Sequence, residues 1–144
     1  DKAVVVLTGD LGVPDTWGHR LVPFPRATAA TPWTEASPAL VCEVTEKQDG
    51  VAVTVAYGTS QGLQRRHAGE FAITRQGHPA AYGTAGLSFD TKFDLRQRIE
   101  LPWTEEFFTV PAQAPHGQHP KLGSLHASMM RALQAAYQAV REDG

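Results

Sequence analysis

The sequence has little of what marks several common classes of protein. It has a single cysteine, Cys42, so no disulfide can form within the chain. Its 13 basic and 15 acidic side chains give a net charge of −2, which provides no overall attraction to nucleic acid or to an anionic membrane but leaves room for a local basic patch. No apolar run approaches the ~20 residues that span a bilayer. We therefore expect a cytoplasmic protein with no membrane partner.

Several catalytic and cofactor motifs are also missing. The chain has no glycine-rich phosphate loop of the GxGxxG or Walker type, no GxSxG elbow and no cysteine–histidine spacing pattern. His116, His119 and His126 are close in sequence, but the first two lie in a stretch rich in proline and glycine, and a metal site needs three or four convergent ligands. The sequence therefore predicts no metal site and no cofactor.

What the chain does have is many short apolar runs separated by turns. Its 10 prolines and 13 glycines are spread between these runs, which favours an α+β, mainly β protein. A length of 144 residues favours a single domain, residues 1–144. Alternating or continuous apolar patterns predict strands at 3–8, 39–44, 51–57, 70–74 and 91–101.

The strands at 39–44 and 51–57 form the centre of this pattern. The polar stretch between them ends in Asp49-Gly50, a strong hairpin signal. The second strand leads into Gly58-Thr59-Ser60-Gln61, which is small, polar and able to form hydrogen bonds. We expect a functional site at this end, near the entry of the first strand at Ser37-Pro38.

The ends of the chain differ in character. Residues 15–37 form a long proline-rich stretch, which either covers the core or closes over a substrate. Trp17, Trp33 and Trp103 could stack on bases, although packing is the more usual role of tryptophan in a small domain.

Apolar residues at helical spacing after Ser124, a plausible N-cap, predict a helix to about Arg141.

An ordered set of short motifs carries a family resemblance over about residues 37–140. These motifs are Pro38-Ala39-Leu40-Val41, Thr59-Ser60-Gln61, Phe71-Ala72-Ile73, and Lys121-Leu122-Gly123-Ser124-Leu125 followed by Met129-Met130. In this order they resemble the MazF/PemK (Kid-like) toxins. The resemblance implies a small SH3-like β-barrel at 37–110 and a C-terminal helix at 121–141. It does not account for the N-terminal strand and long loop at 1–36.

The same resemblance implies a function. MazF/PemK proteins are homodimeric toxins of type II toxin–antitoxin systems, which cleave single-stranded RNA without metal and are neutralised by an antitoxin. In such chemistry a 2′-hydroxyl attacks the adjacent phosphate, so the protein must take a proton, give a proton and stabilise charge on phosphorus. Arginine suits the last task because its planar fork matches two phosphate oxygens.

The chain departs from the family at one position. The family usually has Arg-Pro where this chain has Ser37-Pro38, whereas Thr59 matches the family's threonine. We take Thr59 and a substitute arginine, Arg65, as candidate catalytic residues. The candidate substrate-binding residues are Ser37, Ser60, Gln61, Arg66 and His67. Two hypotheses follow, an endoribonuclease or a non-catalytic relative that keeps the barrel for binding or dimerisation.

Overall fold

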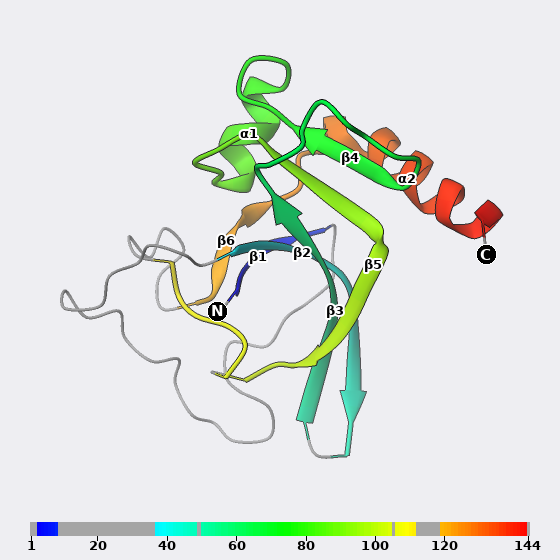
Figure 1. Ribbon diagram of the computed structural model, residues 1–144. Helices are drawn as coiled ribbons and strands as arrows, with labels where there is room; N and C mark the ends of the chain where they lie inside the picture. The colour runs from blue at the N-terminus through cyan, green and yellow to red at the C-terminus, as the bar shows by residue number, and fades with distance from the viewer. Residues whose placement is uncertain (1–2, 9–36, 49, 105, 112–118, 144) are drawn as a thin grey trace.

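The backbone forms one strongly curled sheet with helices packed on one side (Figure 1). The computed structural model describes residues 3–8, 37–48, 50–104, 106–111 and 119–143. The strands are β1 (Ala3–Leu7), β2 (Ser37–Lys47), β3 (Gly50–Thr59), β4 (Glu70–Ile73), β5 (Thr91–Pro102) and β6 (Lys121–Ser124). The helices are α1 (Pro79–Ala85), the short 3₁₀ helix η1 (Ala127–Met129) and α2 (Met130–Asp143). An α+β, mainly β architecture is thereby confirmed.

The six strands lie in the order β4-β5-β3-β2-β1-β6. The predicted hairpin is confirmed, since β2 and β3 pair antiparallel and Lys47 lies opposite Gly50. β5 pairs antiparallel with both β3 and β4, while β1 pairs parallel with both β2 and β6. The sheet therefore has antiparallel strands on one side and parallel strands on the other.

β5 bends where its pairing becomes irregular. Its first part lies between β4 and the end of β3, and its second part pairs with the first half of β3. The register between β3 and β5 shifts here, because Ala56 lies opposite Arg98 while Gly58 lies opposite Phe93. At the bend, the backbone amide of Arg96 donates a hydrogen bond to the side-chain Oδ1 of Asp94 (2.9 Å). This irregularity allows the sheet to curl into a half-barrel.

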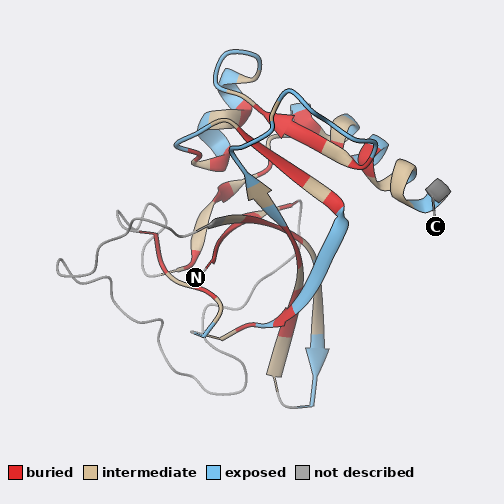
Figure 2. Ribbon diagram, in the orientation of Figure 1, coloured by how far each residue is buried: buried red, intermediate tan, exposed pale blue. Residues whose placement is uncertain are grey.

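Two apolar clusters fill the space on either side of the central strands (Figure 2). The first lies between the sheet and the helices and includes Leu40, Phe93 and Leu133. The second includes Val55 and Trp103, which is fully buried. Packing is therefore the role of Trp103, whereas Trp17, Trp33 and the rest of the 15–36 stretch lie outside the described residues.

The predicted start of the C-terminal helix is wrong. Residues 121–124 form β6 instead, because β1 lies inside the sheet and needs a neighbour on its second side. The chain then turns, and the Leu125 amide donates to Leu7 O (2.8 Å). His126, not Ser124, caps the following turn by accepting from the Ser128 amide (3.1 Å), and α2 runs on to Asp143.

Candidate nucleic-acid interface

Thr59 lies at the exposed end of β3. Its Oγ1 accepts a hydrogen bond from the Gln61 amide (3.1 Å), which turns the chain away from the sheet. The entry of β2 is close by, since a Cβ added at Gly58 would lie 3.2 Å from Pro38 O. The two ends that the sequence marks as a site therefore meet at one end of the central strands β2 and β3, and the Ser37 backbone there pairs with Ala3 of β1.

Residues 60–69, which we call the basic loop, connect β3 to β4. Arg65, Arg66 and His67 are all exposed on it. The loop has internal hydrogen bonds, from the Arg65 amide to Gly62 O (3.0 Å) and from Arg66 Nε to Leu63 O (3.2 Å). Gly62 adopts φ +65°, a left-handed conformation that suits glycine. Three of the predicted site residues are thus presented together on one ordered turn.

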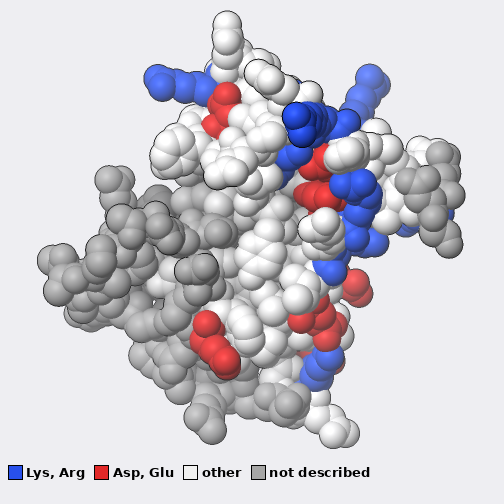
Figure 3. Space-filling view, in the orientation of Figure 1, with Lys and Arg blue, Asp and Glu red and all other residues white. Residues whose placement is uncertain are grey.

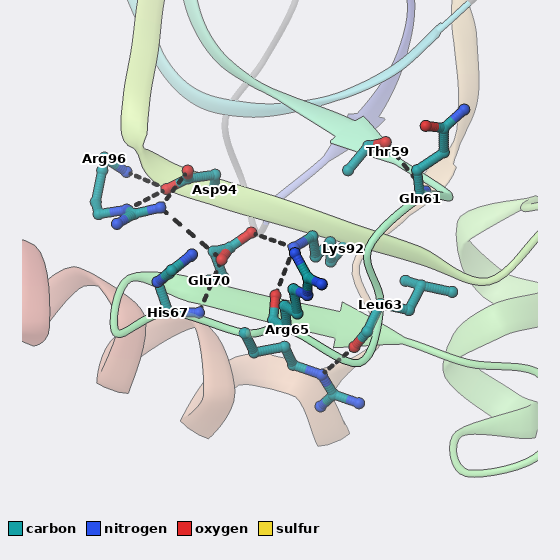
Figure 4. A network of polar contacts seen from close by, with 10 residues as sticks. Thr59, Gln61, Leu63, Arg65, His67, Glu70, Lys92, Asp94 and Arg96 are labelled. Carbon is teal, nitrogen blue, oxygen red and sulfur yellow. Dashed lines mark hydrogen bonds and ion pairs between the residues drawn. The ribbon is translucent and has the colours of Figure 1, made fainter.

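A buried ion pair fixes the basic loop to the sheet (Figure 4). Lys92 of β5 lies opposite Thr59 in the β3–β5 register. Its Nζ donates to Arg65 O (2.7 Å) and lies 3.0 Å from Glu70 Oε2. Glu70 Oε1 in turn accepts from the His67 amide (2.8 Å). The Lys92 side chain is only 10% exposed and the Glu70 side chain only 4%. The loop backbone is therefore held at Arg65 and at His67 from below.

Arg96, four residues after Lys92 on β5, completes this polar network. Its Nε and Nη2 each lie 2.9 Å from a carboxylate oxygen of Asp94, a bidentate pair. Its Nη2 also lies 3.8 Å from Glu70 Oε1. Figure 3 shows basic side chains gathered around this small acidic centre. The network thus balances its inner charges and leaves Arg65 and Arg66 on the outer surface.

The two acidic groups of the network have lowered pKa values. For Glu70, burial by itself raises the pKa, but the His67 amide and the Lys92 ammonium together outweigh it and hold the pKa below its ordinary value. For Asp94, the hydrogen bonds from Arg96 lower the pKa against the opposing effect of burial. Both carboxylates are therefore held in their charged form by specific donors.

This arrangement predicts a loss of stability in acid. A carboxylate whose folded pKa is depressed stabilises the fold fully above its unfolded pKa, about 4 for Asp and Glu, and the contribution is lost as pH falls through the folded value. We expect the free energy of unfolding, measured in urea between neutral pH and about pH 3, to fall with acidification. The variant Glu70→Gln should show a shallower fall, and an equal pH dependence in both proteins would contradict this assignment.

The remaining candidates have structural roles. His119 Nδ1 accepts from the Lys121 amide (3.1 Å) and His126 is the cap described above, while His116 lies outside the described residues. Within the described ranges no three histidine, cysteine or acidic side chains are placed to hold a metal ion. Cys42 is partly buried, and burial raises the pKa of its thiol, so it has no features of a reactive nucleophile.

Lys92 and Glu70 are the site residues that the sequence did not reveal. The alternation in 91–101 places Lys92 on a charged, solvent-facing side of the strand, and this is wrong for Lys92 because the basic loop covers it. The other face is as predicted for Phe93 and Leu95, which are buried. Only the β3–β5 register shows that Lys92 lies opposite Thr59, so the sequence alone could not place Lys92 at the site.

No protein-family model, curated protein or solved structure matches the chain. Membership of the MazF/PemK family therefore stays a prediction from the motifs quoted above. Of the helices in the described ranges, none combines the length and apolar character needed to cross a membrane.

Proposed function

We propose that this chain is a MazF/PemK-like toxin of a type II toxin–antitoxin system that binds single-stranded RNA at the basic loop and the adjoining end of β3. The proposal includes an SH3-like barrel as the finer description of the curled sheet, and an antitoxin peptide as a second partner. The observation that carries it is the presentation of Arg65, Arg66 and His67 on a loop fixed by Lys92 and Glu70. The ordered family motifs support it independently.

The groups at this end suit a nucleic-acid backbone. Arginine side chains offer planar forks for phosphate oxygens, and Arg65 and Arg66 stand on adjacent exposed positions. Thr59, Ser60 and Gln61 are exposed where the same loop leaves β3 and supply neutral hydrogen-bonding groups. Because the loop backbone is already ordered, less conformational entropy is lost when a strand binds.

The same groups define how cleavage would proceed. The ribose 2′-hydroxyl attacks the adjacent phosphorus, a base removes its proton, and the leaving 5′-oxygen receives a proton as its bond to phosphorus breaks. His67 is an exposed group that can exchange a proton, and Arg65 is an exposed cation for the extra charge on phosphate. Thr59 would supply a hydroxyl that helps to hold the substrate backbone.

The alternative function is RNA binding or dimerisation without cleavage. It is favoured by Ser37, because a serine at the entry of β2 cannot supply the positive charge that the family has there. Loss of an arginine that stabilises a transition state costs several orders of magnitude in rate in phosphoryl-transfer enzymes. The RNA-binding version of this alternative uses the same surface as the endoribonuclease and differs from it only in turnover.

Salt-dependent binding tests the shared part. We expect the double variant Arg65→Ala/Arg66→Ala to bind a labelled single-stranded RNA about tenfold or more weakly than the parent protein, because two phosphate contacts are lost. The slope of log affinity against log salt should fall by about 1.4, or about 0.7 per contact. Fluorescence anisotropy over a salt series measures both quantities.

The matched control removes the same charge elsewhere. Arg75 and Arg131 are also exposed, on the β4–α1 turn and at the start of α2. The double variant Arg75→Ala/Arg131→Ala should keep the parental affinity and slope. Equal losses in both double variants would show non-specific attraction, and the absence of any RNA affinity in the parent would overturn the proposal.

Cleavage is tested separately with a mixed single-stranded RNA pool in the presence of a chelator. Mapped product ends that disappear in Thr59→Ala and Arg65→Ala would support the endoribonuclease. Salt-sensitive binding with intact RNA would instead support the non-catalytic alternative. A product that persists in both variants would place the chemistry elsewhere.

A further inference from the structure

Tyr57, near the end of β3, is an exposed aromatic residue beside the candidate site. It is 40% exposed, although Val53 and Val55 earlier on the same strand are fully buried. In the part of the chain that the structure describes, no second ring packs against Tyr57 and no group forms a hydrogen bond with its hydroxyl. The ring and the hydroxyl are therefore available to a ligand.

The position of Gly58 shows which face of the sheet Tyr57 occupies. A Cβ added at Gly58 would lie 2.9 Å from Phe93 Cε1, and Phe93 belongs to the apolar cluster between the sheet and the helices. Successive residues of a strand point to opposite faces. Tyr57 and Thr59, on either side of Gly58, therefore point away from that cluster, and they lie about 7 Å apart on the other face.

The basic loop lies on this same face. Lys92 is directly opposite Thr59 in the β3–β5 register, so the two side chains project from the same side of the sheet. The Lys92 side chain ends beneath the basic loop, where its Nζ donates to Arg65 O (Figure 4). Tyr57, Thr59 and the loop that carries the exposed Arg65 and Arg66 therefore share one face of the sheet.

The bend in β5 explains why Tyr57 is exposed. The β3–β5 register shifts between Ala56 and Gly58, and residues 94–97 of β5 span the interval that Tyr57 alone spans on β3. No residue of β5 is therefore paired with Tyr57. Its partner on β2 is Ala39, whose side chain is too short to cover an aromatic ring. The irregularity that curls the sheet thus also uncovers one ring beside the candidate site.

A second apolar side chain borders the ring. Ile99 lies opposite Val55, which precedes Tyr57 by two residues and so shares its face. Ile99 is 47% exposed, which is unusual for an isoleucine paired with a fully buried valine. A flat apolar group placed on Tyr57 would therefore also contact Ile99 and remove both from water.

We propose that Tyr57 is a stacking platform for one unpaired base of the RNA strand whose phosphates lie against Arg65 and Arg66. This inference rests on the proposed RNA binding, and it adds the residue that contacts a base where the arginines contact the backbone. Every base has a π-face, so the contact selects single-stranded over paired RNA and tolerates any base. A positively charged surface combined with an aromatic platform is a common design of single-strand binders.

A substitution series at Tyr57 tests the stacking. Tyr57→Ala should bind labelled single-stranded RNA about fivefold or more weakly than the parent protein. The slope of log affinity against log salt should not change, because no phosphate contact is lost. Tyr57→Phe and Tyr57→Trp should keep most of the affinity. Tyr57→Leu, the matched control, keeps an apolar side chain without a π-face and should lose about as much affinity as Tyr57→Ala. Urea unfolding shows whether each variant is folded.

An abasic strand measures the contribution of the bases directly. An oligonucleotide of the same length without bases keeps every phosphate. The parent protein should bind the base-bearing strand about fivefold or more tightly than the abasic strand, and Tyr57→Ala should lose most of this preference. An equal loss of affinity for both strands in Tyr57→Ala would mean that Tyr57 does not act on a base, and would overturn the proposal.

The possible results separate the stacking role from the proposed function. If Arg65→Ala/Arg66→Ala lowers the affinity and the salt slope while Tyr57→Ala binds as the parent does, RNA binding stands and the stacking role is wrong. Parental affinity in Tyr57→Leu would also contradict stacking, because an apolar contact would then be sufficient. A parent protein without RNA affinity would overturn both proposals together.

Discussion

Replacing Lys92 with methionine is expected to lower the free energy of unfolding by up to about 3–5 kcal/mol, because it leaves the largely buried carboxylate of Glu70 with only the more distant Arg96 guanidinium, 3.8 Å from its Oε1, as a cationic neighbour. Glu70 is only 4% exposed, so water cannot take the place of the ammonium group. The hydrogen bond to Arg65 O is lost at the same time. Urea unfolding of the parent and the variant at neutral pH measures the difference.

Two further variants show whether the buried pair is the cause. Lys92→Met/Glu70→Gln removes both charges, and a glutamine oxygen can still accept from the His67 amide, so most of the lost stability should return. Lys47→Met breaks the ion pair with Glu100, which is exposed, and should cost at most about 1 kcal/mol. Equal losses in Lys92→Met and Lys47→Met would mean that burial of the pair is unimportant.

Trp103→Ala is expected to cost about 3–5 kcal/mol, the range for removing a large aromatic side chain from a core. Trp103 is fully buried, and its ring lies 4.7 Å from that of Phe108 by centroids. Alanine would leave a cavity in the second apolar cluster, which the surrounding strands can fill only in part. Thermal and urea unfolding of the two proteins measure the loss.

An exposed aromatic residue provides the control for this change. Phe89 is 71% exposed, and Phe89→Ala should change the free energy of unfolding by less than about 0.5 kcal/mol. If Trp103 instead served as a base-stacking platform, its alanine variant would lose RNA affinity and keep its stability. That result would contradict the packing described here.

The strands were predictable from the sequence because their signals are local. Alternation along residues 91–101 and the Asp49-Gly50 hairpin signal are visible in short windows, and the structure contains the strand β5 and the antiparallel β2–β3 pair. The start of the C-terminal helix was not predictable in this way. Residues 121–124 become a strand only through pairing with β1, which lies more than 100 residues earlier. A helical period in the following residues gave no sign of that distant partner.

The candidate site follows the same division. Thr59 and the arginines of the basic loop stood out as residue types beside a strand end, and the structure places Thr59 at the end of β3 and the arginines, exposed, on the loop that follows it. Lys92 and Glu70 did not stand out in the sequence, because their burial results from the path of the basic loop over β5. Charged residues in an alternating strand are usually solvated, and only the fold shows which one is covered.

Because β1 lies between β2 and β6, its pairing cannot be completed until β6 has been synthesised. Of the strands that the structure describes, β1 is synthesised before the others, yet its second neighbour, β6, follows it by more than 100 residues. Until residues 121–124 are available, one side of an apolar valine strand remains an unpaired edge. Such distant parallel pairing is slow to form. The second side of β1 therefore stays unpaired during synthesis until residues 121–124 have been made.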